Sequence, residues 1–250
     1  MPTPPERGPA AFVAEFIGTF ALVFFVTMVV VLFVAQPTAN QPQPFIDWSV
    51  IGLVHVLVLF VLVQTLAVVS GAHFNPAVTF ALMAIRQIRV IDGVIYWLCQ
   101  LAGGICGALV TKALLLDEGR GTHYGAVAIS DRLGATAPGM VAEALGTFFL
   151  VWAIVGVAVN PTAVKGWAGL AIGGALGMGV MIMGPLTGGG FNPARAFGPA
   201  IVGHSFGGGG KWLLVYVLAP AVGGVIAAIG YHYMFILPGK KGVEGLEPVG

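Results

Sequence analysis

The sequence predicts an all-α integral membrane protein with six membrane-spanning helices and two half-length helices that enter the membrane without crossing it. Three observations lead to this fold class: the composition, the lengths of the apolar segments and an internal repeat. Hydrophobic residues make up 58% of the 250 residues and charged residues only 8%, whereas soluble domains carry about 25% charged residues. Lipid is therefore the expected surrounding of the chain. The formal net charge of +1 gives no field that would favour nucleic acid as a partner.

Six apolar segments are long enough to cross a bilayer, which takes about 20 residues in a helix. They cover residues 10–35, 46–69, 93–115, 138–159, 167–185 and 212–237. The first one exceeds the apolar core of a signal peptide, about 7–15 residues, and is expected to be retained as a span. Two further segments, 76–85 and 193–202, would form helices about 15 Å long, which is half the thickness of the hydrocarbon layer.

The chain repeats itself in two places. Residues 14–20 (AEFIGTF) match residues 142–148 (AEALGTF), and residues 74–77 (FNPA) recur at 191–194. These pairs are offset by 128 and 117 positions, so the first half holds a longer loop. The proline-rich segment 36–44 is the candidate for this loop.

Each half of the chain therefore holds three spans and one short segment. Because three is odd, the second half must enter the membrane from the opposite side, which makes the repeat an inverted one. We expect a single transmembrane domain over residues 1–250. Its repeats cover about 10–116 and 138–237, and an outer loop at 117–137 joins them.

Positive charge suggests the orientation, because cytoplasmic loops carry an excess of lysine and arginine. With both termini in the cytoplasm, six such residues fall on the inner side and four on the outer side. The six are Arg7, Arg86, Arg89, Lys165, Lys240 and Lys241, and the four are Lys112, Arg120, Arg132 and Lys211.

The tripeptides Asn75-Pro76-Ala77 and Asn192-Pro193-Ala194 have the composition of a helix start. Asn is a preferred N-cap residue, and Pro at the first helical position lacks only a donor that would have no partner there. Two such half-helices from opposite faces would meet at their N-termini in mid-membrane. These ends would offer donors to a water oxygen and repel cations and protons. One motif of this kind is most simply a helix cap, but two copies in inverted halves favour a pore.

On these motifs the chain resembles the aquaporin (major intrinsic protein) family, from residue 14 to the last span. The strongest similarity lies in residues 70–79 (SGAHFNPAVT) and 190–195 (GFNPAR). The resemblance implies a six-helix bundle with two half-helices, a pore in every subunit and a homotetramer. It implies a passive channel for water and small neutral solutes that excludes protons and ions, with no enzymatic activity and no cofactor.

The resemblance assigns four residues to a selectivity filter at the outer end of the pore. Arg195 follows the second motif, and the family's spacing adds His55, Val180 and Gly189. This set is similar to that of the plant tonoplast intrinsic proteins, which include ammonia-permeable members, so ammonia is a further expected permeant. In some of these relatives a histidine of the outer loop joins the filter. His123 is the candidate for this role, with a solvated loop residue as the alternative.

Charged residues inside a bilayer are costly and usually functional or paired. Glu15 and Glu143 occupy equivalent positions in the repeat. We expect each to be a scaffold residue that accepts bonds from the backbone of a re-entrant loop, since that backbone must find its partners within the protein. Direct contact with the permeant is the alternative. Gln64 and Thr65 are candidates for similar work, and His73 is expected to brace its loop.

The sequence leaves two alternative functions open. Secondary transporters also use inverted repeats with interrupted helices, but no intramembrane carboxylate beyond Glu15 and Glu143 is evident for a coupling ion. The second alternative is a channel mainly for a neutral solute such as glycerol. Glycerol facilitators usually carry Asp after the filter Arg and two aromatic residues in the filter, whereas Ala196 follows Arg195 here. The sequence shows no nucleophile–base pair that would indicate an enzyme, and no His or Cys cluster that would indicate a metal site.

Overall fold

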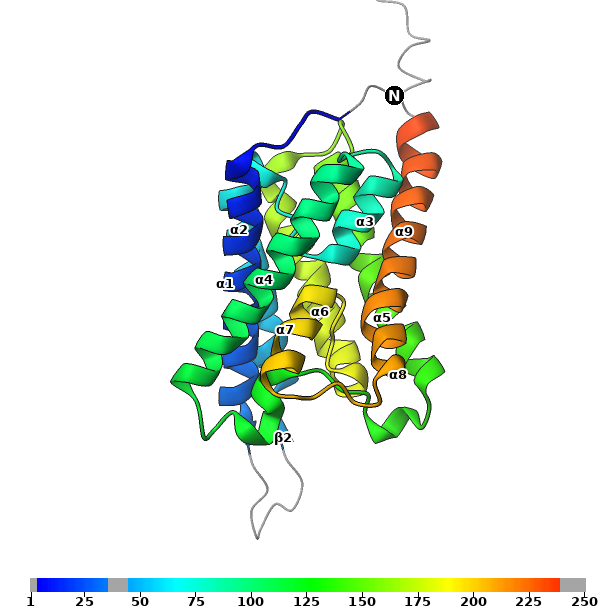
Figure 1. Cartoon of the computed structure of the whole chain (residues 1–250). Helices are drawn as coiled ribbons and strands as arrows, with labels where there is room; N and C mark the ends of the chain where they lie inside the picture. Colours follow the sequence, from blue (N-terminus) through cyan, green and yellow to red (C-terminus); the bar gives the residue numbers. More distant parts are fainter. Residues whose placement is uncertain (1–3, 36–44, 239–250) are drawn as a thin grey trace, which may run out of the picture.

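The computed structural model describes residues 4–35 and 45–238, which fold almost entirely into helices (Figure 1). Six helical segments in this part of the chain are long and apolar enough to cross a membrane. Four of them are α1 (Pro9–Leu32), α2 (Trp48–Ser70), α4 (Val90–Leu114) and α6 (Ala168–Thr187), the last preceded by the 3₁₀ turn η4 (Lys165–Trp167).

The other two spans contain wider π-helical turns, which the apolar pattern does not reveal. Helix α5 (Thr136–Ile154) continues into the turn η3 (Val155–Val159). The last span consists of α8 (Gly210–Leu213), the turn η5 (Leu214–Leu218), α9 (Ala219–Tyr231) and the turn η6 (His232–Ile236). Pro220 follows η5 and has no N–H to donate, so regular α-helical hydrogen bonding cannot continue through this point.

Two short helices occupy the centre of the bundle, α3 (Pro76–Ala84) and α7 (Pro193–Val202), and a proline opens each. Their N-terminal ends approach each other at mid-height, and their C-terminal ends point to opposite faces (Figure 1). Both ends of the described chain lie at the face reached by α3. We call this the terminal face, and the opposite face, which carries the connection between α4 and α5, the loop face.

The two halves of the chain are interlocked through equivalent pairs of helices. Helix α1 lies against α4, and its repeat counterpart α5 lies against α9. Helices α2 and α6 are counterparts of each other and pack together across the two halves. Each half-helix packs against the last span of the other half, α3 against α9 and α7 against α4. The half-helices are therefore held by both repeats.

Glycines set the closest helix contacts. A Cβ at Gly103 of α4 would lie 2.4 Å from the Phe16 carbonyl of α1, and one at Gly173 of α6 would lie 2.4 Å from the Val56 carbonyl of α2. No side chain fits at these distances, so the spacing of both helix pairs depends on glycine.

The connection between α1 and α2 differs from the expected span boundaries. Helix α1 ends at Leu32, and the two-residue strands β1 (Val34–Ala35) and β2 (Phe45–Ile46) pair antiparallel. The sequence assigned residues 33–35 and 46 to the spans because apolar composition alone does not separate a helix end from a short strand. The segment 36–44, expected as the longer loop, lies outside the described residues.

Candidate functional site

The two Asn-Pro-Ala motifs cap the half-helices and are tied to each other. In each motif the Asn Oδ1 accepts the backbone N–H two residues later at 2.9 Å. Each side-chain amide also donates to the other half: Asn75 Nδ2 to the Phe191 carbonyl at 2.9 Å, and Asn192 Nδ2 to the Phe74 carbonyl at 2.8 Å. An amide nitrogen carries two N–H donors, so each Asn keeps one beyond this cross-bond.

A buried carboxylate holds the loop before the first motif. Glu15 is fully buried in α1. Its Oε1 accepts bonds from Ser70 Oγ at 2.7 Å and the His73 N–H at 2.9 Å, and its Oε2 from the Phe74 N–H at 2.7 Å and Gln100 Nε2 at 2.8 Å. These bonds supply partners to loop backbone that lies away from water.

Glu143 has the same position in the second half. Its Oε1 accepts bonds from Thr187 Oγ1 at 2.6 Å and the Gly190 N–H at 2.9 Å, and its Oε2 from the Phe191 N–H at 2.6 Å. Tyr216 in turn donates its hydroxyl to the Thr187 carbonyl at 2.8 Å. Both carboxylates thus contact the re-entrant loops, and neither lines the cavity described below.

The repeat around the two glutamates has a second consequence that sequence reasoning missed. A Cβ at Gly18 would lie 2.1 Å from the Phe74 ring, and one at Gly146 would lie 2.0 Å from the Phe191 ring. Both phenylalanines adopt the left-handed region, with φ of 49° and 50°, which non-glycine residues rarely do. In each half, the Glu of the Glu-x-x-Gly segment therefore accepts the Phe N–H, and its Gly leaves room for the ring of the Phe that directly precedes the Asn.

Several polar partners of the loops were not identified from the sequence. Ser70 and Thr187 could have been, because each stands five positions before the Asn of its motif. In the described part of the chain, the expected helpers Gln64 and Thr65 form no hydrogen bond to the re-entrant loops. Gln64 Nε2 donates to the Gly166 carbonyl at 3.5 Å, and Thr65 Oγ1 bonds within its own helix. The helical period places these two positions on a different face of α2 from Ser70.

A narrow cavity passes the two asparagines. Its volume is about 20 Å³, little more than the roughly 10–15 Å³ that one water molecule requires. The polar groups along it belong to a few residues, which are His55, His73, Asn75, Gly190, Asn192 and Arg195. Most of its other lining side chains are Leu, Ile and Val. Towards the terminal face it adjoins a vestibule of about 400 Å³, with which it shares lining residues.

Two of the four expected filter residues line this cavity. His55 is 2% exposed, and its Nδ1 lies 2.8 Å from the Ile51 carbonyl. Since a carbonyl only accepts, Nδ1 carries the proton, and Nε2 of the neutral ring is an acceptor. This Nε2 has no partner among the described residues. Arg195, 3% exposed, donates from Nη1 to the Gly125 carbonyl at 3.0 Å, and its Nε has no partner in the described part of the chain.

The other two expected filter residues are close neighbours. Val180 is fully buried, and a Cβ at Gly189 would lie 3.2 Å from Val180 Cγ2. Gly189 also has a φ of +61°, in the region that favours glycine. Neither residue is among those that line the narrow cavity.

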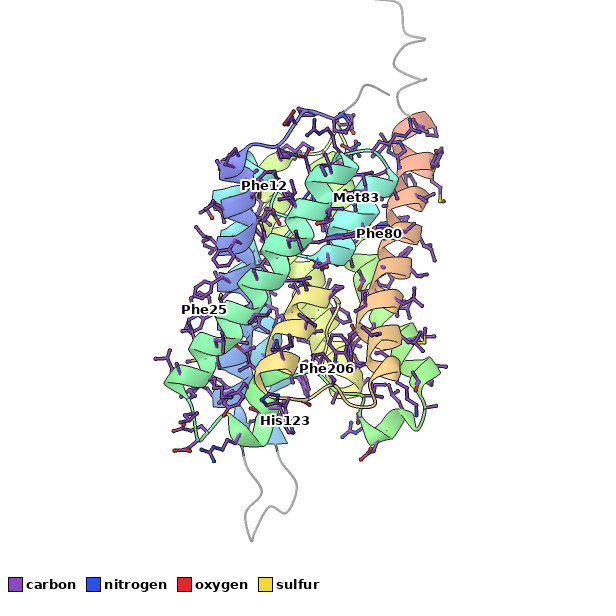
Figure 2. All side chains as sticks on the ribbon, viewed as in Figure 1. Phe12, Phe25, Phe80, Met83, His123 and Phe206 are labelled. Carbon is purple, nitrogen blue, oxygen red and sulfur yellow. The ribbon has the colours of Figure 1, made fainter. Side chains whose placement is uncertain are left out.

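The outer-loop histidine does not lie with the filter. The connection between α4 and α5 contains the 3₁₀ turns η1 (Arg120–Gly125) and η2 (Asp131–Leu133). His123 and Tyr124 are both left-handed, with φ of 47° and 55°. This turn buries Tyr124 and leaves the His123 side chain exposed at the loop face (Figure 2). The contact to Arg195 comes instead from Gly125. The structure thus places His123 as a solvent-facing loop residue, the interpretation that the sequence left open beside a place in the filter.

His73 lies where the narrow cavity adjoins the vestibule. Its Nδ1 is 3.1 Å from Thr79 Oγ1 in the first half-helix, and its ring packs edge-on against Tyr96. These contacts brace the loop. Within residues 4–35 and 45–238, no group of three His, Cys, Asp or Glu side chains could hold a metal ion.

An ion-pair cluster at the terminal face ties the N-terminal segment to α4. Arg89 contacts Asp92 at 2.7 Å and Glu6 at 3.1 Å, and the Arg7 N–H donates to Asp92 at 3.4 Å. Hydrogen bonding to Asp92 raises the pKa of the Arg89 guanidinium above its ordinary value. The tether brings the Arg7 side chain to the vestibule, which Lys165 also lines. Two cationic side chains therefore face the vestibule.

Comparisons with known proteins agree with this geometry. The model of the major intrinsic protein family matches residues 8–231. The probable aquaporin AqpM of Archaeoglobus fulgidus is 38% identical over 245 residues, which cover 89% of this chain and 96% of the relative. The probable aquaporin TIP2-1 of Oryza sativa subsp. japonica is 36% identical over 230 residues, which cover 90% of this chain and 88% of the relative.

A solved structure has the same architecture. The aquaglyceroporin from Plasmodium falciparum superposes with a TM-score of 0.76, over 92% of this chain and 97% of that one. The two share 22% sequence identity, so this likeness concerns the fold alone. The family match and the identity to curated relatives settle the classification: the chain belongs to the aquaporin (major intrinsic protein) family, whose members are passive membrane channels and not enzymes.

Proposed function

We propose that this chain is a water channel that excludes protons and ions. One observation carries the proposal. The remaining donors of Asn75 and Asn192, together with the Arg195 guanidinium, lie along a cavity with a volume of about 20 Å³. This volume admits water with little space to spare.

The positions of donors and acceptors suggest how water passes. In mid-pore a water oxygen can accept hydrogen bonds from both asparagines. It then has no lone pair free to accept a hydrogen bond from the next water molecule along the pore. This arrangement interrupts a chain of hydrogen bonds along which a proton could move. The N-termini of α3 and α7 add partial positive charge at the same point, which opposes cations and protons. Apolar side chains elsewhere along the cavity hold water only weakly.

The filter supports a narrow range of solutes. Ammonia is close to water in size, can accept a bond from Arg195 and can donate one to His55 Nε2, so we include it as a further permeant. Glycerol is excluded in this proposal. Its bulk exceeds the narrow cavity, and Ala196 is fully buried, where a glycerol facilitator would usually carry Asp. A secondary transporter is disfavoured because both intramembrane glutamates bond to loop backbone.

We extend the proposal to topology and assembly. The single domain has inverted repeats over about residues 10–116 and 138–237, and both termini face the cytoplasm, in agreement with the excess of Lys and Arg on that side. The assembly is a homotetramer with one pore in each subunit.

Reconstituted vesicles test the function directly. Vesicles that contain the protein should shrink several times faster than empty vesicles under osmotic shock, with a low activation energy, and should still hold a pH gradient. Arg195→Val should weaken the exclusion of cations. Arg132→Val, at an exposed arginine of the outer loop, is the matched control and should behave as wild type. Equal shrinkage of protein-containing and empty vesicles would contradict the proposal.

A further inference from the structure

The four filter positions have counterparts in the opposite half of the chain. The two motif asparagines are 117 positions apart, so each filter residue has an equivalent at that offset. His55 corresponds to Ile172, Val180 to Val63, Gly189 to Ala72, and Arg195 to Val78. We call Val63, Ala72, Val78 and Ile172 the inner ring.

The backbone follows this correspondence. Ala72 has a φ of 53° and Gly189 a φ of 61°, both in the left-handed region. The Val78 N–H is bonded by Asn75 Oδ1 at 3.4 Å, as the Arg195 N–H is bonded by Asn192 Oδ1 at 3.2 Å. The inner ring is therefore built by the same local structure as the filter, on the other side of the motifs.

The inner ring lies where the pore changes width. Ala72, Val78 and Ile172 line both the narrow cavity and the vestibule, and Val63 lines the vestibule. All four side chains are at most 9% exposed and belong to one apolar cluster. Three of the four side chains therefore lie at the junction between the 400 Å³ vestibule and the 20 Å³ cavity.

The chemistry of the two rings is opposite. The filter offers an imidazole and a guanidinium, whereas the inner ring has only aliphatic side chains. Water and solutes that enter between aliphatic side chains lose hydrogen bonds without replacement, and such constrictions resist wetting. We propose that the inner ring is a second selectivity element of this pore, which limits water flux and opposes polar solutes through the cost of desolvation. This inference rests on the proposed water channel.

The imidazole of His73, a polar group next to the ring, fits this role. The Thr79 hydroxyl donates to the Asn75 carbonyl and accepts a bond from Gln100 Nε2. It can therefore only accept from His73 Nδ1, which leaves His73 Nε2 as an acceptor. Because His73 lines both cavities, water that has crossed the aliphatic side chains can donate a bond there.

Threonine substitutions test the ring, because threonine is close to valine in shape and adds a hydroxyl. Val78→Thr should raise water permeability per channel roughly threefold, the effect of one hydrogen bond added at the barrier. Ile172→Thr should act in the same direction and serves if Val78→Thr folds poorly. Glycerol should stay excluded because the filter is unchanged. Val68→Thr is the matched control, since Val68 lies on the vestibule wall, 90% exposed and outside the ring.

The outcomes separate the two proposals. Wild type that passes water, with Val78→Thr and Ile172→Thr at the level of Val68→Thr, overturns the inner ring and leaves the water channel standing. Wild type that passes no more water than empty vesicles overturns the proposed function, and the ring with it. A rise in both ring variants with an unchanged control supports the inference.

Discussion

Single side chains decide whether the re-entrant loops keep their shape, and Glu143 is the clearest case. Its carboxylate accepts three bonds, two of them from loop N–H groups. Glu143→Gln keeps the size but turns one acceptor oxygen into a donor, which leaves a buried N–H unpaired. We expect a loss of about 1–3 kcal/mol of unfolding free energy and slower water flux. Thermal unfolding in detergent measures this, with Glu118→Gln at an exposed loop site as control; equal stability of the two variants would contradict the scaffold role.

The outer loop allows a second prediction at this scale. Because His123 is exposed and Gly125 makes the contact to Arg195, His123→Ala should change neither water nor ammonia permeability. Gly125→Ala should alter both, since Gly125 has a φ of +80° and an added Cβ would lie 3.0 Å from Thr27 Cα. Alkalinisation of dye-loaded vesicles after addition of ammonium reports ammonia entry. A selective loss of ammonia flux in His123→Ala would return this residue to the filter.

Residue roles were predictable where the repeat duplicated a distinctive residue. Glu15 and Glu143 stood out as charges in apolar spans, and their expected partners were loop N–H groups, as observed. Gln100 could not be assigned, because it lies on α4, far in sequence from the loop that it supports. The position of His123 depends on two consecutive left-handed residues, which no sequence signal announced.

Among helices, α6 offers two adjacent glycines with opposite surroundings. A Cβ at Gly173 would lie 2.4 Å from a backbone carbonyl of α2, whereas one at Gly174 would meet nothing within 4 Å. Gly173→Ala should therefore push α2 and α6 apart and cost about 1–3 kcal/mol. Gly174→Ala should be neutral or slightly stabilising, because alanine favours the helix by up to about 1 kcal/mol. Unfolding temperatures of the purified variants compare the two, and a similar loss in both would show that close α2–α6 contact is not the cause.

The half-helices were predictable as elements because the sequence marks where each one starts and how long it can be. Asn-Pro starts each helix, and each apolar segment is too short to span the membrane. Their mutual arrangement required the structure. The cross-bonds from Asn75 to Phe191 and from Asn192 to Phe74 join residues more than 100 positions apart. The π turns η3, η5 and η6 could not be predicted either, because an apolar pattern reports burial in lipid and not hydrogen-bond geometry.

The inverted repeat determines the plan of the whole molecule. An odd number of spans in each half predicts opposed halves, but it does not say which helices touch. The structure shows each half-helix against the last span of the other half, so neither half completes its own packing. In our proposal, the same symmetry lets one local structure carry the polar filter on one side of the motifs and the aliphatic inner ring on the other. In that proposal, differences at three of the four positions, with valine kept at 63 and 180, give the two sides of the motifs different chemistry.

Orientation is the property of the whole molecule that the arrangement of faces makes testable. Glu118 lies in the connection between α4 and α5, and Gln87 in the connection between α3 and α4; both are exposed. These two connections lie at opposite faces of the bundle (Figure 1). In a background of Cys99→Ser and Cys106→Ser, Glu118→Cys should react with a membrane-impermeant thiol reagent added to intact cells. Gln87→Cys should react only after permeabilisation. Labelling of Gln87→Cys in intact cells, with Glu118→Cys protected, would reverse the proposed orientation and place both termini outside.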